Sequence, residues 1–507
     1  MRGGRRGAIA AGHPLTAEAG AEVLAEGGNA FDAAIAALWM ACVCEPVLAS
    51  PGGGGFLTAL PADHAPGGRV RVFDFFPVAP SRKRPGDEVE FAEVTVDFGT
   101  ALQAFHVGAG ASAAPGFMSG LFAVHEAFGS LPMRRLAEPA VAAARAGVTI
   151  TDLQAYLFQV VEPIYRWTDD AEALFAVGGK MPASGTVLRN PDLGEVIEAV
   201  SREGLRIATE GEIATAMAEV CDRHDGHLSF ADLKAYEVAL RDPLETAIRT
   251  PDGAYRVHLN PPPALGGALV AAMLADLDPH ETRRGTADQI ARARTIDAVD
   301  RFWREAPTDP GRLIGSKGQR PSQAASRGTT HVSVIDADGN AAAVTVSNGE
   351  GNGRLVPGCG FMLNNILGEE DLNPDGFGRW KPGSRLGSMM TPGIATGPDG
   401  GVIAFGSGGS NRIRTAILQA LLNRCAVDMR LFEAIEAPRI HIERGHLDFE
   451  DLFSAGDREQ LTAAFPDHRA WPDRNLYFGG VHAVERNAKG QFDAAGDPRR
   501  GGASVIV

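Results

Sequence analysis

Cysteine is scarce in this 507-residue sequence, and its distribution argues against two common uses of the residue. The cysteines are odd in number and form no Cys-x-x-Cys pair, which is unlike a zinc site or a disulfide framework. They are Cys42, Cys44, Cys221, Cys359 and Cys425. We therefore expect neither a bound metal nor a structural disulfide.

Long apolar runs and basic runs with interleaved aromatic residues are also missing. No window is apolar enough to span a bilayer, and the arginines within residues 1–12 are not followed by an apolar stretch of signal-peptide length. The net charge is -15, and no basic run carries interleaved aromatic residues, unlike a nucleic-acid groove. We expect no membrane or nucleic-acid partner and a cytoplasmic location, or a periplasmic one if the natural chain starts earlier.

The composition is that of a large globular enzyme with both helices and strands. Hydrophobic residues make up 44% and charged residues 22%, which suits one large layered domain or several ordinary ones. Residues 153–245 are predicted to be mainly helical, whereas 56–60, 330–336, 341–347 and 402–405 have the composition of strands.

A polar loop gives way to a predicted strand at Gly328-Thr329-Thr330. Residues 309–327 are rich in glycine, proline and serine and lack an apolar period, which predicts a mobile exposed loop. A hydroxyl at such a junction can be a nucleophile, although threonine is also an ordinary strand residue.

The turn after this strand decides which residues face the junction. Asp338-Gly339 is a strong hairpin signal, and with these two as the turn residues Thr330 lies opposite Ser347. Thr329 then lies opposite Asn348, and a bulge would shift the pairing by one. Either register brings the return strand within reach of Thr329.

Cleavage before Thr329 would give its hydroxyl a base without a histidine partner. The freed α-amine has an ordinary pKa of about 7.7–8.0, so part of it can accept a proton at neutral pH. The same hydroxyl can make the cut by attacking the carbonyl of Gly328, which has no side chain to hinder the attack. His331 is then expected to be a structural strand residue.

A second glycine-rich segment, Gly406–Asn411, follows the predicted strand 402–405 and precedes a predicted helix, 412–422. We call it the glycine loop. A loop of this kind points backbone N–H groups at a phosphate or an oxyanion. The lysine that a nucleoside-triphosphate loop needs is missing, so an oxyanion fits better and no cofactor is expected.

Taken together, these stretches resemble the γ-glutamyltransferases, also called glutathione hydrolases, a family of amino-terminal-nucleophile enzymes. The matches follow one another in order along nearly the whole chain. They are His13-Pro14-Leu15, Gly27-Gly28-Asn29-Ala30, Asp32-Ala33-Ala34, Gly52 to Phe56, Pro115-Gly116 with Gly120, Pro261-Pro262-Pro263 with Gly266-Gly267, Thr329-Thr330-His331, Asp338-Gly339-Asn340, Asn364-Asn365, Ser388-Met389, Gly406 to Ser410, Ala437-Pro438-Arg439 and Asp497-Pro498-Arg499-Arg500.

The resemblance implies an α+β fold, a four-layer αββα sandwich, made as one precursor that cleaves itself between Gly328 and Thr329. A large subunit, 1–328, ending in the loop 309–328, would stay paired with a small subunit, 329–507, as a heterodimer. The implied substrates are small γ-glutamyl amides such as glutathione, whose γ-glutamyl group passes to water or to an amino-acid or peptide acceptor.

The resemblance also assigns roles to particular residues. Thr329 would be the nucleophile, Ser347 would orient it, and Ser388 would contact the α-carboxylate of the substrate. Gly408 and Gly409 would supply the oxyanion N–H groups, or Gly409 and Ser410 if the glycine loop aligns without a gap. Asn348 would either bond the nucleophile or turn the chain.

The sequence departs from the family around the amino-acid head group. The arginine expected after an Ala-Pro motif is replaced by Pro85, so Arg84 either substitutes for it or belongs to a surface basic cluster. Glu369 stands near the family's amine-binding aspartate and either reaches the amine or is an exposed acid. The first of two adjacent serines is Gly387. Acyl transfer is therefore better supported than glutathione as the substrate.

Three hypotheses follow. The first is a γ-glutamyl hydrolase or transferase. The second keeps the nucleophile but changes the acyl group to another short amide, such as a dicarboxylic monoamide or a β-lactam side chain. The third is an unprocessed binding protein, against which the intact Gly328-Thr329-Thr330 junction and Ser347 argue.

Overall fold

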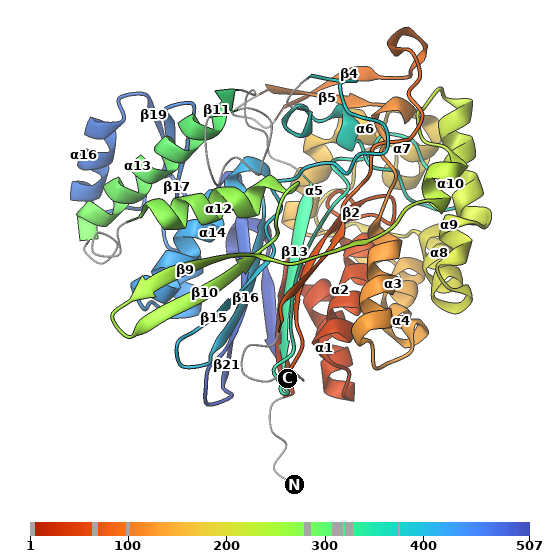
Figure 1. Cartoon of the computed structure of the whole chain (residues 1–507). Coiled ribbons are helices and arrows are strands. Elements are labelled where there is room, and N and C mark those ends of the chain that lie inside the picture. The colour runs from red at the N-terminus through yellow and green to blue at the C-terminus, as the bar shows by residue number, and fades with distance from the viewer. Residues whose placement is uncertain are drawn as a thin grey trace.

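Two antiparallel sheets face each other at the centre of the molecule, with helices on both outer sides (Figure 1). This computed structural model describes residues 6–62, 69–97, 102–277, 285–306, 318–319, 328–373 and 376–507. The layers confirm the expected αββα sandwich. The predicted loop at 309–327 lies outside the described residues, except for Gly318 and Gln319.

The first sheet carries the predicted nucleophile on β13, next to the strand that begins the described chain. In spatial order its strands are β22 (Ala503–Ile506), β1 (Gly7–Ala11), β13 (Thr329–Asp336), β14 (Ala341–Ser347), β2 (Gly54–Leu60), β3 (Arg71–Phe75) and β8 (Ala239–Arg241). Its outer face is covered by apolar helices, among them α1 (Pro14–Glu26), α2 (Ala30–Cys44), α3 (Phe117–Phe128), α4 (Met133–Ala146) and α8 (Pro191–Glu203).

The second sheet carries the glycine loop at the end of β16. In spatial order its strands are β21 (Phe492–Ala495), β20 (Gly480–Arg486), β16 (Val402–Gly408), β15 (Gly393–Thr396), β10 (Gly253–Leu259) and β9 (Leu244–Thr250). Its outer layer comprises α12 (Leu265–Asp276), α13 (Gly285–Arg304), α14 (Ile413–Leu421), α15 (Leu431–Glu436), α16 (Ala455–Ala464) and a small sheet of β17 (Ile440–Glu443), β18 (His446–Glu450) and β19 (His468–Trp471).

The middle third is mainly helical, as predicted, and lies beside the first sheet (Figure 1). Its helices are α5 (Asp152–Val160), α6 (Glu162–Tyr165), α7 (Asp169–Phe175), α9 (Arg206–Thr209), α10 (Glu212–Arg223) and α11 (Phe230–Lys234). Short two-stranded sheets complete the chain: β4 (Ala92–Asp97) with β5 (Leu102–Val107), β6 (Val148–Thr149) with β7 (Val187–Leu188), and β11 (Glu305–Ala306) with β12 (Gly318–Gln319). Among the described residues, no helix is long and apolar enough to cross a membrane.

Small side chains fill the space between the two sheets. Ala8 and Ala10 of β1, Ala343 of β14 and Ala404 of β16 belong to one fully buried cluster. On β13, Ile335 points into this cluster, whereas Val334 packs with the helices on the other side. All eight residues of β13 are buried, so both faces of this strand are covered.

The β13–β14 hairpin pairs one residue away from the predicted register. Thr329 faces Ser347, and Thr330 faces Val346. The prediction assumed a two-residue turn, but the loop has three residues and ends at Gly339, which has φ 96. A third loop residue in the left-handed conformation is a common alternative, and it shifts the pairing by one.

Asp336 holds this longer turn together and joins it to α2. Its carboxylate accepts the backbone N–H groups of Gly339 and Asn340, both at 3.0 Å, and that of Ala30 at 2.9 Å. Burial raises the pKa of this carboxyl group above its usual value. Because the turn sets the register, these contacts support the pairing of Thr329 with Ser347.

Replacing Asp336 by alanine is expected to lower the free energy of unfolding by about 2–3 kcal/mol, because three N–H groups lose an ionised acceptor. Urea titration of a chain that also carries Thr329→Ala, which should prevent self-cleavage, measures the change. Asp338→Ala in the exposed part of the same turn is the control. Equal stability of the two variants would show that the turn does not depend on Asp336.

Candidate active site

Thr329 is buried at the first position of β13, and the carbonyl before it is already engaged. The Ser347 hydroxyl donates a hydrogen bond to the carbonyl oxygen of Gly328. The N–H of Gly349 donates to Ser347 Oγ at 3.0 Å, which leaves the serine proton pointing at that carbonyl. Self-cleavage requires attack at this carbonyl carbon, and a fixed donor on its oxygen stabilises the negative charge that attack creates.

Gly328 is fixed on its other side as well. Its N–H donates to Glu350 Oε1 at 3.2 Å, and Glu350 is buried. A methyl group on Gly328 would collide with the carbonyl oxygens of Gly349 and Val47. The residue before Thr329 therefore has to be glycine for this backbone to approach so closely.

Thr330 is anchored by a carboxylate that the sequence analysis did not find. Its hydroxyl donates to Glu45 Oε2 at 2.7 Å, and the Thr16 hydroxyl donates to Oε1 at 2.7 Å. Glu45 ends α2 and is completely buried, and this burial raises its pKa to about 7. No sequence pattern connects residue 45 with residue 330, because the contact is made only when α2 packs on β13.

The structure brings the glycine loop against Thr329. A methyl group on Gly408 would collide with the carbonyl oxygen of Thr329, so the two main chains touch. Ser410 has φ 53, a conformation that glycine usually occupies, and its buried hydroxyl has no hydrogen-bond partner in the described chain. Whether Gly408 with Gly409 or Gly409 with Ser410 supply the oxyanion donors stays a prediction.

Two further predicted residues lie beside this centre. Asn348 is buried, and its Oδ1 atom has no hydrogen-bond partner within the described residues. Glu369 is only 3% exposed, so it is not the solvated acid that was one of its two expected roles. A methyl group on Gly349 would lie 2.5 Å from Glu369 Oε1, which places this carboxylate next to the turn that orients Ser347.

The other two predicted substrate contacts have structural partners. Arg84 Nε donates to the Gly226 carbonyl at 2.8 Å. Its other nitrogens lie 2.7 Å from Asp222, in the last turn of α10, and 3.5 Å from Asp225, just beyond that helix. Ser388 is buried, and its Oγ accepts the N–H of Met390 at 3.1 Å. Their contact with a substrate stays a prediction.

His331 lies in the interior between the sheets. Its Nδ1 and Nε2 atoms are each 2.8 Å from a hydroxyl, of Thr345 and Ser333 respectively. Burial, and then the neighbouring His482, hold its pKa well below the ordinary value, so the ring is neutral. These contacts suit the structural role expected for it.

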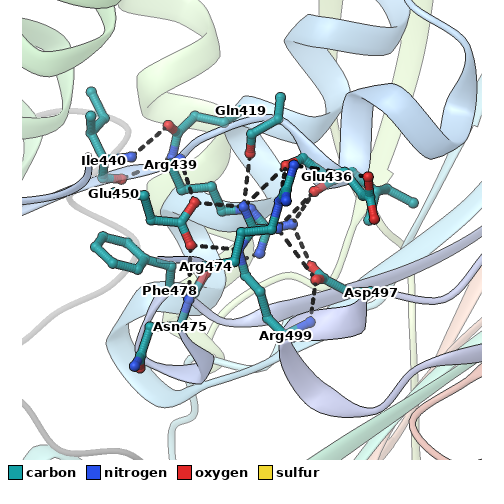
Figure 2. A network of polar contacts seen from close by, with 12 residues as sticks. Gln419, Glu436, Arg439, Ile440, Glu450, Arg474, Asn475, Phe478, Asp497 and Arg499 are labelled. Atoms are coloured by element: carbon teal, nitrogen blue, oxygen red, sulfur yellow. Dashed lines mark hydrogen bonds and ion pairs between the residues drawn. The ribbon is translucent and has the colours of Figure 1, made fainter. Parts of the chain in front are cut away.

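Buried ion pairs fix the chain segments behind the glycine loop. Figure 2 shows Arg439 and Arg499 between the carboxylates of Asp497 and Glu450. Arg439 Nη2 lies 2.5 Å from Asp497, and Arg499 Nη2 lies 2.6 Å from Glu450. The motifs Ala437-Pro438-Arg439 and Asp497-Pro498-Arg499 thus hold the C-terminal segment against β20, the strand that pairs with β16.

Two facing sheets between helical layers, with a hydroxyl residue opening a central strand, define an amino-terminal-nucleophile hydrolase fold. The family model described as Gamma-glutamyltranspeptidase matches residues 16–301 and 305–507. The chain therefore belongs to the γ-glutamyltranspeptidase family, whose characterised relatives include both glutathione hydrolases and acylases.

Relatives of both kinds match nearly the full chain. The Acylase ACY 1 proenzyme of Pseudomonas sp. (strain V22) is 29% identical over 545 residues, covering 99% of this chain and 94% of the relative. The Glutathione hydrolase proenzyme of Pseudomonas aeruginosa is 29% identical over 558 residues, with the same two coverages, 99% and 94%. The crystal structure of cephalosporin acylase from Bacillus halodurans shares the fold, with a TM-score of 0.81 at 23% identity over 99% of this chain and 96% of that one.

Removing the Ser347 hydroxyl is expected to slow self-cleavage about 100-fold, because the Gly328 carbonyl loses its donor. Intact-mass measurements over time on Ser347→Ala should show persistent full-length chain, with Thr329→Ala uncleaved throughout. Thr345→Val, which removes a hydroxyl two residues away on the same strand, is the matched control. Cleavage of Ser347→Ala at the rate of this control would refute the role of the hydroxyl.

Glu45→Gln is expected to change how stability depends on pH. Between the usual carboxyl pKa of 4.5 and the folded value of about 7, the unfolded chain releases the proton while the folded chain keeps it. The free energy of unfolding of the wild type should therefore fall as the pH rises across this range, by about 3 kcal/mol more than that of Glu45→Gln. Above about pH 7 the two proteins should show the same dependence on pH. Urea titrations from pH 4.5 to 8 in the Thr329→Ala background measure this, with the exposed Glu18→Gln as control. Parallel curves over the whole range would contradict it.

Proposed function

We propose that this chain is the precursor of a self-processing threonine enzyme that transfers the acyl group of a small amide to water or to an amine acceptor. The hydrogen bond from Ser347 to the Gly328 carbonyl carries the proposal. An ordinary strand residue would not need a buried hydroxyl, a buried carboxylate and a glycine loop gathered around the peptide bond before it.

Self-cleavage exchanges an amide for an ester. The Thr329 hydroxyl oxygen attacks the Gly328 carbonyl carbon, the bond from that carbon to the Thr329 nitrogen breaks, and the nitrogen takes up the hydroxyl proton. Water then hydrolyses the ester, which leaves a Gly328 carboxylate and a free Thr329 α-amine. The products are fragments 1–328 and 329–507, which remain together as a heterodimer.

The mature enzyme then repeats this chemistry on a substrate. The α-amine accepts the proton of the Thr329 hydroxyl while its oxygen attacks the substrate carbonyl. The oxyanion that forms faces the amides of the glycine loop, and its collapse releases the amine of the substrate with the proton returned to it. Water or an acceptor amine attacks the resulting acyl-threonine ester.

For the acyl group, we propose γ-glutamyl, with Glu369 binding the α-amine of the substrate. The burial of Glu369 beside Gly349 supports this role, because a buried carboxylate suits a cationic partner. A second candidate is a short acyl group without an amino-acid head group, such as a dicarboxylic monoamide or a β-lactam side chain. Arg84 was the residue expected to bind the α-carboxylate of the substrate. Its contacts with Asp222 and Gly226 support the second candidate, because they already occupy its guanidinium.

Two anilides that differ only in the α-amino group separate these candidates. With γ-glutamyl-4-nitroanilide, Glu369→Gln is expected to lower kcat/KM about 10- to 100-fold, because the ammonium group loses a charged partner. With glutaryl-4-nitroanilide the variant should match the wild type. Asp371→Asn, nearby in sequence, is the control. A wild type that turns over only the glutaryl amide would refute the γ-glutamyl proposal in favour of the second candidate.

A further inference from the structure

Two buried arginines beside the glycine loop, Arg500 and Arg412, form no ion pair with a carboxylate of the described residues, whereas two neighbouring arginines do. Arg439 and Arg499 are paired with Asp497 and Glu450, as Figure 2 shows. Within the described chain, by contrast, Nε and Nη2 of Arg500 have no hydrogen-bond partner. Burying a guanidinium whose N–H groups are not all paired is costly, which makes the position of Arg500 worth explaining.

Arg412 is in a similar position at the start of the helical segment that follows the glycine loop. Its Nε donates to the Tyr477 carbonyl at 3.1 Å and its guanidinium lies 4.3 Å from the centre of the Tyr477 ring, yet Nη1 has no hydrogen-bond partner in the described residues. Burial, and then the charge of Arg412, lower the pKa of Arg500 to about 10. Arg500 therefore remains charged at neutral pH.

The guanidinium of Arg500 lies next to Gly408 and Gly409 of the glycine loop. Its aliphatic carbons pack on Gly480, the residue that pairs with Gly408 across β16 and β20. A methyl group on Gly408 would lie 3.3 Å from Arg500 Nη1 and would also collide with the Thr329 carbonyl oxygen. A methyl group on Gly409 would lie 3.5 Å from Arg500 Nη2. The charge thus lies beneath Gly408, which ends β16, and Gly409, which follows it.

We propose that Arg500, with Arg412 beside it, is a positioning residue that stabilises the oxyanion through the glycine loop. This inference rests on the proposed acyl transfer. A fixed cation in a site without water acts strongly on charge that develops nearby, and it needs no rearrangement during the reaction. Because the oxyanion exists only in the transition state and the tetrahedral intermediate, the charge should raise kcat and leave substrate binding unchanged.

Arg500→Met, which keeps most of the side-chain volume without the charge, tests the proposal in the processed full-length protein. With whichever anilide the wild type hydrolyses, kcat should fall about 10- to 100-fold and KM should stay within about twofold. The matching boronic acid, 2-amino-4-boronobutanoate or 3-carboxypropylboronate, becomes a tetrahedral anion when the threonine oxygen adds to boron. Its inhibition constant should rise by the same factor as kcat falls, whereas that of the free acid product should not change.

Arg500→Lys and Arg474→Met are the comparison variants. Lysine keeps the charge and should retain at least a tenth of wild-type kcat. Arg474, an exposed arginine of the network in Figure 2, should be dispensable for kcat. Three results would overturn the proposal. They are a wild-type kcat in Arg500→Met, a rise in KM without a fall in kcat, and an Arg500→Lys variant that is folded and processed but inactive. If Arg500→Met does not cleave itself, the kcat of processed Arg500→Lys decides whether the proposal holds. A wild type inactive on both anilides would instead refute the proposed function.

Discussion

The two central sheets touch at Gly408 and the Thr329 carbonyl, and the active site depends on this contact. No side chain fits at Gly408, because a methyl group there would collide with Thr329. The contact places the glycine loop of one sheet directly over the first residue of a strand in the other. In the proposed mechanism each sheet supplies half of the chemistry: the first carries the Thr329 hydroxyl and Ser347, and the second carries the candidate oxyanion amides. The alanines between the sheets permit this close packing along the remaining length of the strands.

Within the first sheet, the turn of the hairpin decides whether the nucleophile and Ser347 can cooperate. Directly opposed residues in an antiparallel pair point to the same face, so pairing Thr329 with Ser347 puts both on one side of the sheet. In the register with a two-residue turn, Ser347 would face Thr330 and would lie on the side away from Thr329. The left-handed Gly339 and the carboxylate of Asp336 therefore affect chemistry at the other end of the strand.

Sequence reasoning succeeded where the information was local. The hairpin, the change from strand to glycine loop to helix, and the hydroxyl at the junction are each visible within about ten residues, and the family resemblance supplied the layered fold. It did not find Glu45, whose contact with Thr330 joins segments 285 residues apart. From sequence position it offered Arg84 either as a ligand or as part of a surface cluster, and it could not show that Asp222 and Gly226 meet this side chain through tertiary packing. The register failed by one residue because loop length cannot be read from Asp338-Gly339 alone.

Buried carboxyl groups and buried arginines lie on different sides of Thr329. Glu45 meets Thr330, Glu350 meets the Gly328 amide, and Glu369 lies beside Gly349, all contacts of the first sheet and its loops. Arg500 and Arg412 lie on the side of the second sheet, beneath and after the glycine loop. In the proposed acyl transfer the α-amine becomes positive while the substrate carbonyl oxygen becomes negative. Acids around the amine and arginines behind the oxyanion favour both changes at once, so the charge arrangement of the folded chain matches the charge separation of the reaction. Such buried charges reduce the stability of the fold, which is the expected cost of a preorganised site.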